Sequence, residues 1–360
     1  MTREGPVKCV VWDIDNTLLT GVYLESDEPP GADPVLAAVL AELGERGILH
    51  ALASKNPPEA AAHTARVTGW RFAAAECGWG RKSDALARIA ATLGIAVDAL
   101  AFVDDDPFER AEVGWALPGV LVLSPEEAAE AASWPEFSPP VITPEARRRA
   151  EMYAERQRRQ AAERSFGGTR EEFLESAGTR VTIAAATTAD VPRLEELAAR
   201  TRQLNSAGAG MAQDWFRGPL PAPGREVVIV RLRDAFGDDG MVGGCVIDRD
   251  QQTGIWAVPL LMMSCRAMGR GVIDALLAWL TRQAARAGAR RLLIPCVTNS
   301  RNVPLRLALA GAGFRAPGPA GTDHGDAGPA PAAYQRDLNP PLPGLPGWVR
   351  APGEPGGDAA

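Results

Sequence analysis

A short apolar run that stops at two carboxylates constrains most strongly how this chain can fold. The run at 10–12 is followed at once by Asp13 and Asp15, in the stretch CVVWDIDNTLLTG. Residues i and i+2 of an extended strand project to the same side, so both carboxylates point one way where the strand ends. A buried strand does not carry such a pair unless a cation or a reaction needs it.

Strand-like and helix-like runs alternate from residue 7 to about residue 125. Strand-like runs such as ILHALASKN and LAFVDDDP alternate with helix-like runs such as PVLAAVLAELGERG and KSDALARIAATLG. This alternation predicts an α/β domain with a doubly wound parallel sheet, whose functional groups lie at the carboxyl ends of the strands. A second α/β block is expected over 179–316, where the strand GIWAVPLLMMSC leads into a long amphipathic helix.

The chain is therefore expected to form a domain at 1–140, a charged helical linker at 141–178, a second domain at 179–316 and a tail at 317–360. The tail is rich in Pro and Gly, a composition typical of disorder. A net charge of −7 argues against general nucleic-acid binding. No leader sequence is evident, and no apolar run approaches the roughly 18 residues of a membrane span. We expect a cytoplasmic protein that binds neither nucleic acid nor a membrane.

Three further polar groups stand at strand ends or helix starts in the first block. Ser54, followed by Asn56, ends one strand and can bind a phosphoryl oxygen; Lys82 lies at a helix entry and supplies a fixed positive charge. Asp104 and Asp105 end another strand and offer the hard oxygen ligands that Mg²⁺ prefers. With a divalent cation present, one carboxylate of the first pair can attack phosphorus while the other handles the leaving group's proton.

This order of D-x-D-x-T, Ser, Lys and D-D resembles the haloacid-dehalogenase (HAD) superfamily of phosphoryl-transfer enzymes. The resemblance implies that Asp13 is the nucleophile and Asp15 the general acid/base, and that Ser54 and Lys82 hold the phosphate. It also implies a Mg²⁺ site made by Asp13, Asp15, Asp104 and Asp105. Taken singly, each Asp is equally well explained as a turn or helix-cap residue, and Asp106 before Pro107 is expected to be one.

A second constellation lies at 260–277, where Arg266, Gly269 and Gly271 form R-x-x-G-x-G at a strand-to-helix turn. Glycines there let the backbone approach a ligand, and amides at a helix N-terminus bind phosphates. The motif resembles the acyl-coenzyme-A loop of GNAT acyltransferases, and Asn299 and Asn302 before a later helix resemble that fold's last cofactor-contacting segment. These five residues are the expected phosphopantetheine site, and the second domain is expected to be GNAT-like.

Five cysteines are scattered along the chain without a CxxC pair, which indicates reduced thiols. Cys265 stands just before the glycine loop, where the GNAT resemblance places it near a pantetheine thioester, so it is the expected acyl-carrying thiol. A buried, inert role remains open for it, because free cysteines commonly pack as small hydrophobes. Cys9 is a weaker candidate, and Cys77, Cys245 and Cys296 are expected to be packing or loop residues.

Several strings together resemble the FkbH-like proteins, over about residues 7–316. These are KCVVWDIDNTL, ILHALASKN, LAFVDDDPFERAEV, RTRQLNSAG and LMMSCRAMGRGV. The resemblance implies transfer of a D-glyceryl unit from 1,3-bisphosphoglycerate to an acyl carrier protein in polyketide biosynthesis, through an enzyme thioester and with removal of phosphate. The chain departs from the family at Leu19-Thr20-Gly21, where that family usually has a Trp-Gly-Gly loop. Gln203 and Asn205 are second-tier candidates for contact with substrate or pantetheine.

Two other functions stay open at this point. One is a Mg²⁺-dependent small-molecule phosphatase fused to an acyl-CoA N-acetyltransferase, which requires acetyl-CoA binding. The other is a non-catalytic scaffold that binds a carrier protein and releases no phosphate.

Overall fold

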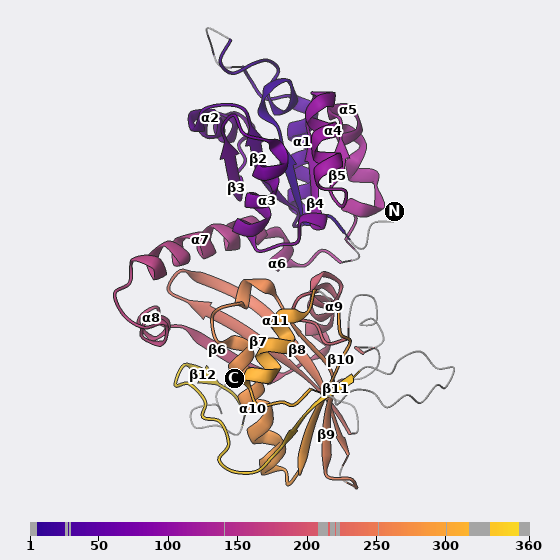
Figure 1. The fold of residues 1–360 in the computed structure, drawn as a ribbon, viewed down its shortest axis with the longest axis vertical. Helices are drawn as coiled ribbons and strands as arrows, with labels where there is room; N and C mark the ends of the chain where they lie inside the picture. The colour runs from indigo at the N-terminus through magenta and orange to yellow at the C-terminus, as the bar shows by residue number, and fades with distance from the viewer. Residues whose placement is uncertain are drawn as a thin grey trace, which may run out of the picture. The chain divides into compact units, whose positions relative to one another are not determined.

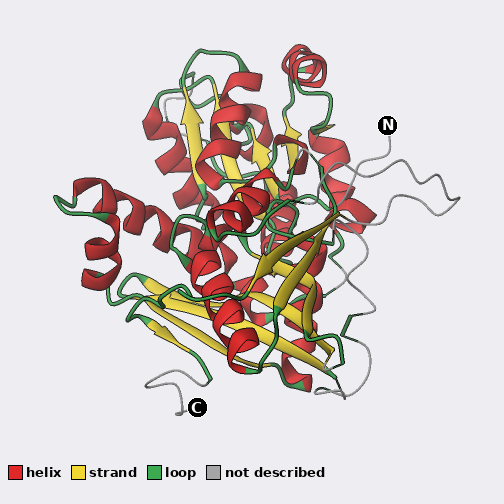
Figure 2. Ribbon diagram, turned by 60° about the horizontal axis from the view of Figure 1, so that its bottom comes forward, coloured by secondary structure: helices red, strands yellow, loops and turns green. Residues whose placement is uncertain are grey.

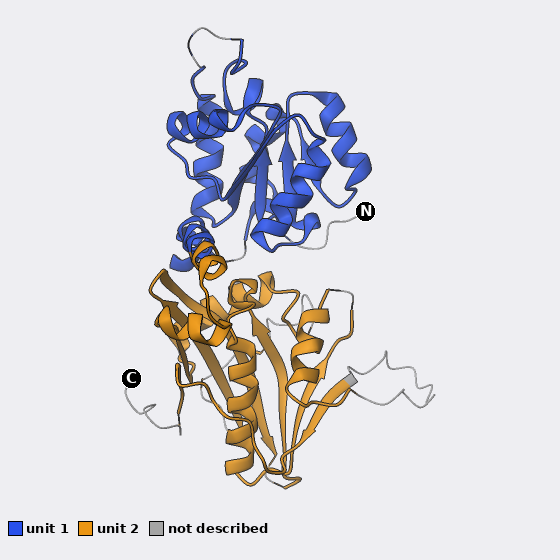
Figure 3. Ribbon diagram, turned by 60° about the vertical axis from the view of Figure 1, so that its left-hand side comes forward, with its two compact units in different colours: residues 1–158 blue, residues 159–360 orange. Residues whose placement is uncertain are grey.

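The computed structural model describes residues 6–25, 28, 30–139, 141–207, 215–216, 220, 224–250, 252–299, 301–316 and 332–352. The chain divides into two compact units, residues 1–158 and 159–360 (Figure 3). The division falls inside the segment expected to be a separate linker, so that segment is shared between the units. Within the described ranges, no helix combines the length and the apolar character needed to cross a membrane.

The first unit is built on a sheet whose five described strands are all parallel, in the order β3-β2-β1-β4-β5 (Figure 1). The strands are β1 (Cys9–Trp12), β2 (Leu49–Ser54), β3 (Ala74–Cys77), β4 (Leu100–Val103) and β5 (Leu121–Leu123). Helices follow them in turn: α1 (Pro34–Glu45), α2 (Pro58–Thr68), α3 (Lys82–Leu93), α4 (Pro107–Ala116) and α5 (Pro125–Glu130).

Two hydrophobic cores lie on opposite faces of this sheet, because successive residues of each strand alternate in direction. Val10 and Trp12 pack with α1 on one face, whereas Cys9 and Val11 pack with α3 on the other. Figure 2 shows helices on both sides of the parallel strands. Every residue of β1 is buried, which explains why its sequence is a continuous apolar run. The doubly wound α/β fold expected for this domain is confirmed.

The charged segment after residue 140 forms the helices α6 (Pro144–Arg147), α7 (Arg149–Ser165) and α8 (Arg170–Ser176). A run of charged residues on a helix usually forms a solvated face, but two arginines of this segment are buried. Arg149 is 7% exposed and Arg159 5% exposed. Arg149 donates to the carbonyl of Gly47 at 2.6 Å, and Arg156 to that of Leu93 at 3.0 Å. Gly47 lies just past the end of α1 and Leu93 is the last residue of α3, so the arginines satisfy acceptors at helix ends.

The second unit contains a sheet with seven described strands in the order β11-β10-β9-β8-β7-β6-β12. The central strands are β6 (Arg180–Ala185), β7 (Arg225–Asp234), β8 (Gly237–Asp250), β9 (Ile255–Met263) and β10 (Arg291–Cys296). The helices α9 (Val191–Arg200), α10 (Val272–Arg286) and α11 (Val303–Gly311) accompany them. The α/β class expected here, with a strand leading through a glycine loop into a helix, is confirmed.

The expectation of a disordered tail is wrong for residues 332–352. Strand β11 (Ala332–Asp337) pairs antiparallel with β10, and β12 (Val349–Arg350) pairs parallel with β6. Tyr334 and Val349 are buried in the core of the second unit. Both strands are short and carry polar residues, so the sequence gives little sign of them beside the prolines and glycines that separate them. Residues 317–331 and 353–360 lie outside the described residues.

Candidate active site

The candidate site lies at the carboxyl ends of the neighbouring strands β2, β1 and β4. Asp13 directly follows β1, Asp104 directly follows β4, and Ser54 is the last residue of β2. After Asp13 the chain enters a tight helical turn, Ile14–Leu18, in which Asn16 adopts a φ of 49°. Asparagine tolerates this left-handed conformation better than most residues, so it suits the turn that follows β1 and Asp13.

Three carboxylates meet at this edge. One oxygen each from Asp13, Asp104 and Asp105 lies within 4.8 Å of the others. Asp13 is 7% exposed and Asp104 1% exposed, whereas Asp105 lies at the surface. Two buried carboxylates and a third beside them form a hard oxygen cluster of the kind that holds Mg²⁺. The residues therefore fit the cation that the sequence predicts.

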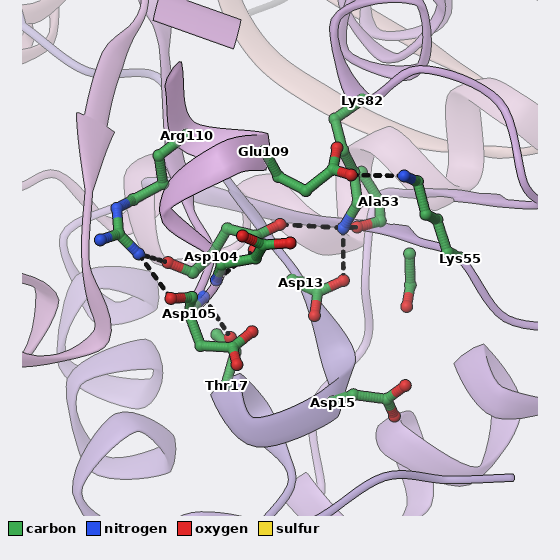
Figure 4. Close-up of polar contacts among 12 residues, drawn as sticks. Asp13, Asp15, Thr17, Ala53, Lys55, Lys82, Asp104, Asp105, Glu109 and Arg110 are labelled. Carbon is green, nitrogen blue, oxygen red and sulfur yellow. Dashed lines mark hydrogen bonds and ion pairs between the residues drawn. The ribbon is translucent and has the colours of Figure 1, made fainter. Parts of the chain in front are cut away.

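Lys82, the first residue of α3, lies between the buried carboxylates (Figure 4). Its ammonium donates to Asp13 Oδ1, to Asp104 Oδ2 at 3.0 Å and to the carbonyl of Ala53 at 2.7 Å. The side chain is 4% exposed, so all three donors of the ammonium are used inside the protein. Lys82 thus lies against Asp13, the predicted nucleophile, and its role toward a phosphate stays a prediction.

Burial dominates the electrostatics of this cluster. It raises the pKa of Asp13 to about 6, against the opposing effect of Lys82, and it also raises the pKa of Asp104. Burial alone would lower the pKa of Lys82, but Asp13 and Asp104 raise it above its ordinary value. One lysine facing three carboxylates leaves an excess of negative charge, which a divalent cation would neutralise.

Asp15 lies apart from the three clustered carboxylates. Its Oδ1 accepts from the backbone N–H of Tyr23 at 2.9 Å, and its Oδ2 accepts from Asn56 Nδ2 at 2.8 Å. Asn56 Nδ2 also donates to Ser54 Oγ at 3.0 Å. Hydrogen bonds therefore connect Asp15, Asn56 and Ser54. The Asp15 carboxylate, predicted to be a metal ligand, does not join the cluster of Asp13, Asp104 and Asp105. A role for Asp15 in proton transfer stays a prediction.

Residues that the sequence did not single out hold the loop after β4. Arg110 Nη1 donates to the carbonyls of Asp104 and Asp105, each at 2.7 Å, and Thr17 Oγ1 accepts from the N–H of Asp105 at 3.2 Å (Figure 4). Asp106 accepts from Phe108 N at 2.8 Å and caps α4, as expected of a turn residue. No spacing rule points to Arg110, because its target is backbone at the end of a strand.

In the second unit, the predicted phosphate loop is occupied by the chain's own side chains. Arg266 is 4% exposed and donates to the carbonyl of Asp239. Gly269 and Gly271 have φ values of 76° and 66°. A Cβ at Gly269 would come within 2.5 Å of Arg170, and one at Gly271 within 3.2 Å of the Trp348 ring. The glycines therefore allow internal packing, and no ligand is needed to explain them.

Asn299 and Asn302 are likewise engaged within the chain. Asn299 N donates to Asn302 Oδ1 at 3.2 Å, and Asn302 N donates to Asn299 Oδ1 at 2.9 Å. Asn302 is fully buried, and its Nδ2 donates to the carbonyl of Val297. The pair builds the turn that starts α11. Asn205, the second-tier candidate, is also buried, and its Nδ2 donates to the carbonyl of Thr201 at 3.1 Å.

Four of the five cysteines can now be placed. Cys9, Cys245 and Cys296 are buried in hydrophobic cores, and burial raises the pKa of each thiol above its ordinary value. Cys265 opens the short turn Cys265–Ala267 after β9 and is partly exposed. Cys265 belongs to the second unit, whereas the carboxylate cluster belongs to the first.

The raised pKa of Asp13 leads to a prediction about magnesium. In the metal-free protein the ionised Asp13 carboxylate destabilises the fold. The stabilisation that the protonated carboxyl group gives is therefore complete below its ordinary pKa of 3.8 and is lost as pH rises through about 6. Because a cation binds the ionised form, Mg²⁺ at 100 times its Kd should add about 2.7 kcal/mol at pH 7.5 and much less at pH 5. Calorimetry with Mg²⁺ or with EDTA at both pH values measures this; equal shifts in melting temperature would contradict it.

Known proteins that resemble this chain were found among solved structures only. No protein-family model and no curated protein matches this chain. Similar solved structures include the Mg-complexed N-terminal part, with its phosphatase domain, of a Bacteroides fragilis protein (28% identity, 37% of this chain and 39% of that chain, TM-score 0.30). A second is a Moraxella catarrhalis 3-deoxy-D-manno-octulosonate 8-phosphate phosphatase with magnesium, phosphate and the sugar (20% identity, 32% and 64%, TM-score 0.26). A third is a Salmonella typhimurium acetyltransferase that modifies the N-terminal serine of ribosomal protein L7/L12 (16% identity, 44% and 94%, TM-score 0.33). This chain thus spans less than half the length of the first of these proteins.

Proposed function

We propose that this chain is a cytoplasmic enzyme that takes a D-glyceryl unit from 1,3-bisphosphoglycerate, removes phosphate and loads the unit onto an acyl carrier protein for polyketide biosynthesis. The observation that carries the proposal is the buried pair Asp13 and Asp104 with Lys82 between them, at the open end of a parallel sheet. A site of this kind handles phosphoryl groups. The glyceryl donor and the carrier rest on the resemblance of the sequence to FkbH-like proteins.

Removal of the 3-phosphate would start with Asp13. One of its carboxylate oxygens attacks phosphorus, the bond from phosphorus to the substrate oxygen breaks, and Asp15 donates a proton to that oxygen. Water then attacks the phosphoryl group on Asp13 and gives a proton back to Asp15. Ser54 Oγ holds a phosphoryl oxygen during both steps, and the positive charge of Lys82, which already donates to Asp13 and Asp104, lies beside it. A Mg²⁺ held by Asp13, Asp104 and Asp105 would neutralise the charge of the phosphate as it meets these carboxylates.

Asn56 positions two of these groups at once. It donates one amide hydrogen to Asp15 and one to Ser54 (2.8 and 3.0 Å), and it is 1% exposed, so its orientation is fixed by its surroundings. The Asp15 carboxylate and the Ser54 hydroxyl are therefore held by one rigid amide. This arrangement explains why an asparagine stands two residues after the strand that carries Ser54.

The decisive experiment supplies the enzyme with 1,3-bisphosphoglycerate, Mg²⁺ and a holo carrier protein, and follows the carrier by intact mass spectrometry. We expect the carrier to gain the mass of one glyceryl group, with release of inorganic phosphate. Phosphate release without a mass gain on any of several carriers would leave a phosphatase and contradict the transfer. Acetyl-CoA binding by calorimetry, together with acetylation of an amine, would instead favour the N-acetyltransferase alternative.

A further inference from the structure

A cavity of about 50 Å³ lies next to the carboxylate cluster in the first unit. A single buried water needs about 10–15 Å³ of such space, so the cavity has room for a small polar group. Its walls are Ser54, Glu76, Cys77, Gly78, Gly80, Arg81, Lys82, Ala85 and Arg88. Cys77 packs in part against the hydrophobic core of this unit, as the sequence predicted, and it also lines this cavity.

The cavity is continuous with the predicted phosphate site, because Ser54 and Lys82 line both. Ser54 and Cys77 are direct partners in the register of the parallel strands β2 and β3, and Gly78 N donates to the carbonyl of Ser54 at 2.9 Å. Directly paired residues of neighbouring parallel strands project to the same side of a sheet. The hydroxyl and the thiol therefore stand side by side where the strands end.

Ser54 keeps an unused hydrogen-bond donor in this cavity. Its Oγ accepts from Asn56, and among the described residues no acceptor is recorded for its own proton, although the side chain is 3% exposed. A buried donor without an acceptor is unfavourable in the absence of a ligand. A phosphoryl or acyl oxygen in the cavity would accept this proton.

The charges that line the cavity suit an anionic ligand. Arg81, Lys82 and Arg88 line it with Glu76 as the single carboxylate. Arg88 Nε donates to Glu76 at 2.7 Å and Lys82 pairs with Asp13 and Asp104, so Arg81 is the cation that can meet an anion. Arg81 is exposed and directly precedes α3, and it lines the cavity. A three-carbon molecule with a phosphate at each end can place one phosphate at Ser54 and Lys82 and the other toward Arg81.

We propose that Cys77, and not Cys265, is the thiol that receives the acyl group from the acyl phosphate. This inference rests on the proposed function and names the nucleophile of its acyl-transfer step. The cavity brings one thiol beside the phosphate-holding Ser54 and Lys82 within a single unit. Cys265, by contrast, opens the turn Cys265–Ala267 after β9 in the second unit.

Transfer of the acyl group to Cys77 needs no reactant other than the acyl phosphate. The sulfur of Cys77 forms a bond to the carbonyl carbon, the bond from that carbon to the phosphate oxygen breaks, and the thiol proton leaves on the phosphate as HPO₄²⁻. Burial raises the pKa of Cys77, with Asp13 and Glu76 adding to the effect, so the thiol keeps its proton until a basic phosphate oxygen is present. The glyceryl thioester then passes to the carrier's thiol, which restores Cys77.

The test is peptide mass spectrometry of the full-length protein after incubation with 1,3-bisphosphoglycerate and Mg²⁺ without carrier. We expect an adduct that hydroxylamine removes, located on the peptide that contains Cys77. Cys77→Ala should lose more than about 90% of the adduct, while Cys265→Ala should keep it. In the unmodified wild type, 3-phosphoglycerate should slow alkylation of Cys77 by iodoacetamide several-fold without slowing that of Cys265, which tests the site even where Cys77→Ala folds poorly.

The outcomes separate the inference from the proposed function. An adduct that maps to Cys265, or that persists in Cys77→Ala, overturns the role of Cys77 and leaves glyceryl transfer in place. Loss of protection by 3-phosphoglycerate counts against Cys77 as well. No adduct on any cysteine of the wild type, combined with no loading of a carrier, overturns the transfer function itself.

Discussion

Asp13→Asn should abolish release of inorganic phosphate, with a fall in kcat on the order of 10⁴-fold or more, the scale seen when a catalytic nucleophile is removed. The amide keeps the size and shape of the side chain but has no negatively charged oxygen to attack phosphorus. It also removes one of the three clustered carboxylates, so Mg²⁺ binding should weaken. A malachite-green assay of phosphate release in saturating Mg²⁺ measures the effect.

The change should leave the fold intact. Burial raises the pKa of Asp13 to about 6, which means that its charge is unfavourable in the folded protein at pH 7. Asn removes that penalty and in return deprives Lys82 of one ionic partner, so the two effects oppose each other. Asp106→Asn is the matched control, because Asp106 only caps α4 and asparagine caps a helix equally well. Full activity in Asp13→Asn, or equal loss in Asp106→Asn, would contradict the nucleophile assignment.

The sequence was sufficient to predict the carboxylate cluster, because a parallel sheet brings the carboxyl ends of neighbouring strands to the same edge. Once β1 and β4 are recognised as parallel neighbours, their carboxyl ends must meet, and the residues that follow them, Asp13 and Asp104, must approach each other. The same logic places Ser54 at the end of β2. Lys82 was predictable as a helix entry, although its two carboxylate partners were visible only in three dimensions.

Other parts of the site depend on contacts that no pattern encodes. Cys77 lines the cavity because β3 pairs with β2 in one particular register, and a shift of one residue would turn its thiol to the other face. The motif R-x-x-G-x-G predicted a ligand loop, yet its arginine and glycines serve internal packing against Asp239, Arg170 and Trp348. Motifs specify local backbone, whereas the partners of buried side chains come from distant segments.

A second arginine of that loop, Arg270, belongs to a buried ionic network in the second unit. Arg270 is 2% exposed and binds Asp239 and Asp234, the latter at 2.5 Å. Arg159 lies 3.6 Å from the same Asp234 oxygen. Burial, reinforced by the neighbouring charge of Arg270, lowers the pKa of Arg159 to about 10. Asp234 thus separates two buried arginines that would otherwise repel each other.

Asp234→Asn should lower the free energy of unfolding of the second unit by about 3–5 kcal/mol, the range for a buried ion pair that loses one partner. The amide can still accept from the N–H of Phe236, as Asp234 does at 2.9 Å, so the turn into β8 is kept and only the charge is lost. Urea unfolding followed by circular dichroism measures the change. Asp238→Asn, exposed in the same hairpin, is the control and should stay within about 0.5 kcal/mol of wild type.

A second substitution distinguishes charge repulsion from lost packing. If Asp234→Asn destabilises the unit because Arg159 and Arg270 are left without their shared carboxylate, then removing one of those charges should restore stability. Asp234→Asn combined with Arg159→Met should therefore be more stable than Asp234→Asn alone, with a coupling energy of about 1–3 kcal/mol in the double-mutant cycle. Methionine keeps the apolar stem of the arginine and discards its charge. Strictly additive losses would show that the network stabilises the unit through packing, and that the charge of Asp234 is not what holds the two arginines together.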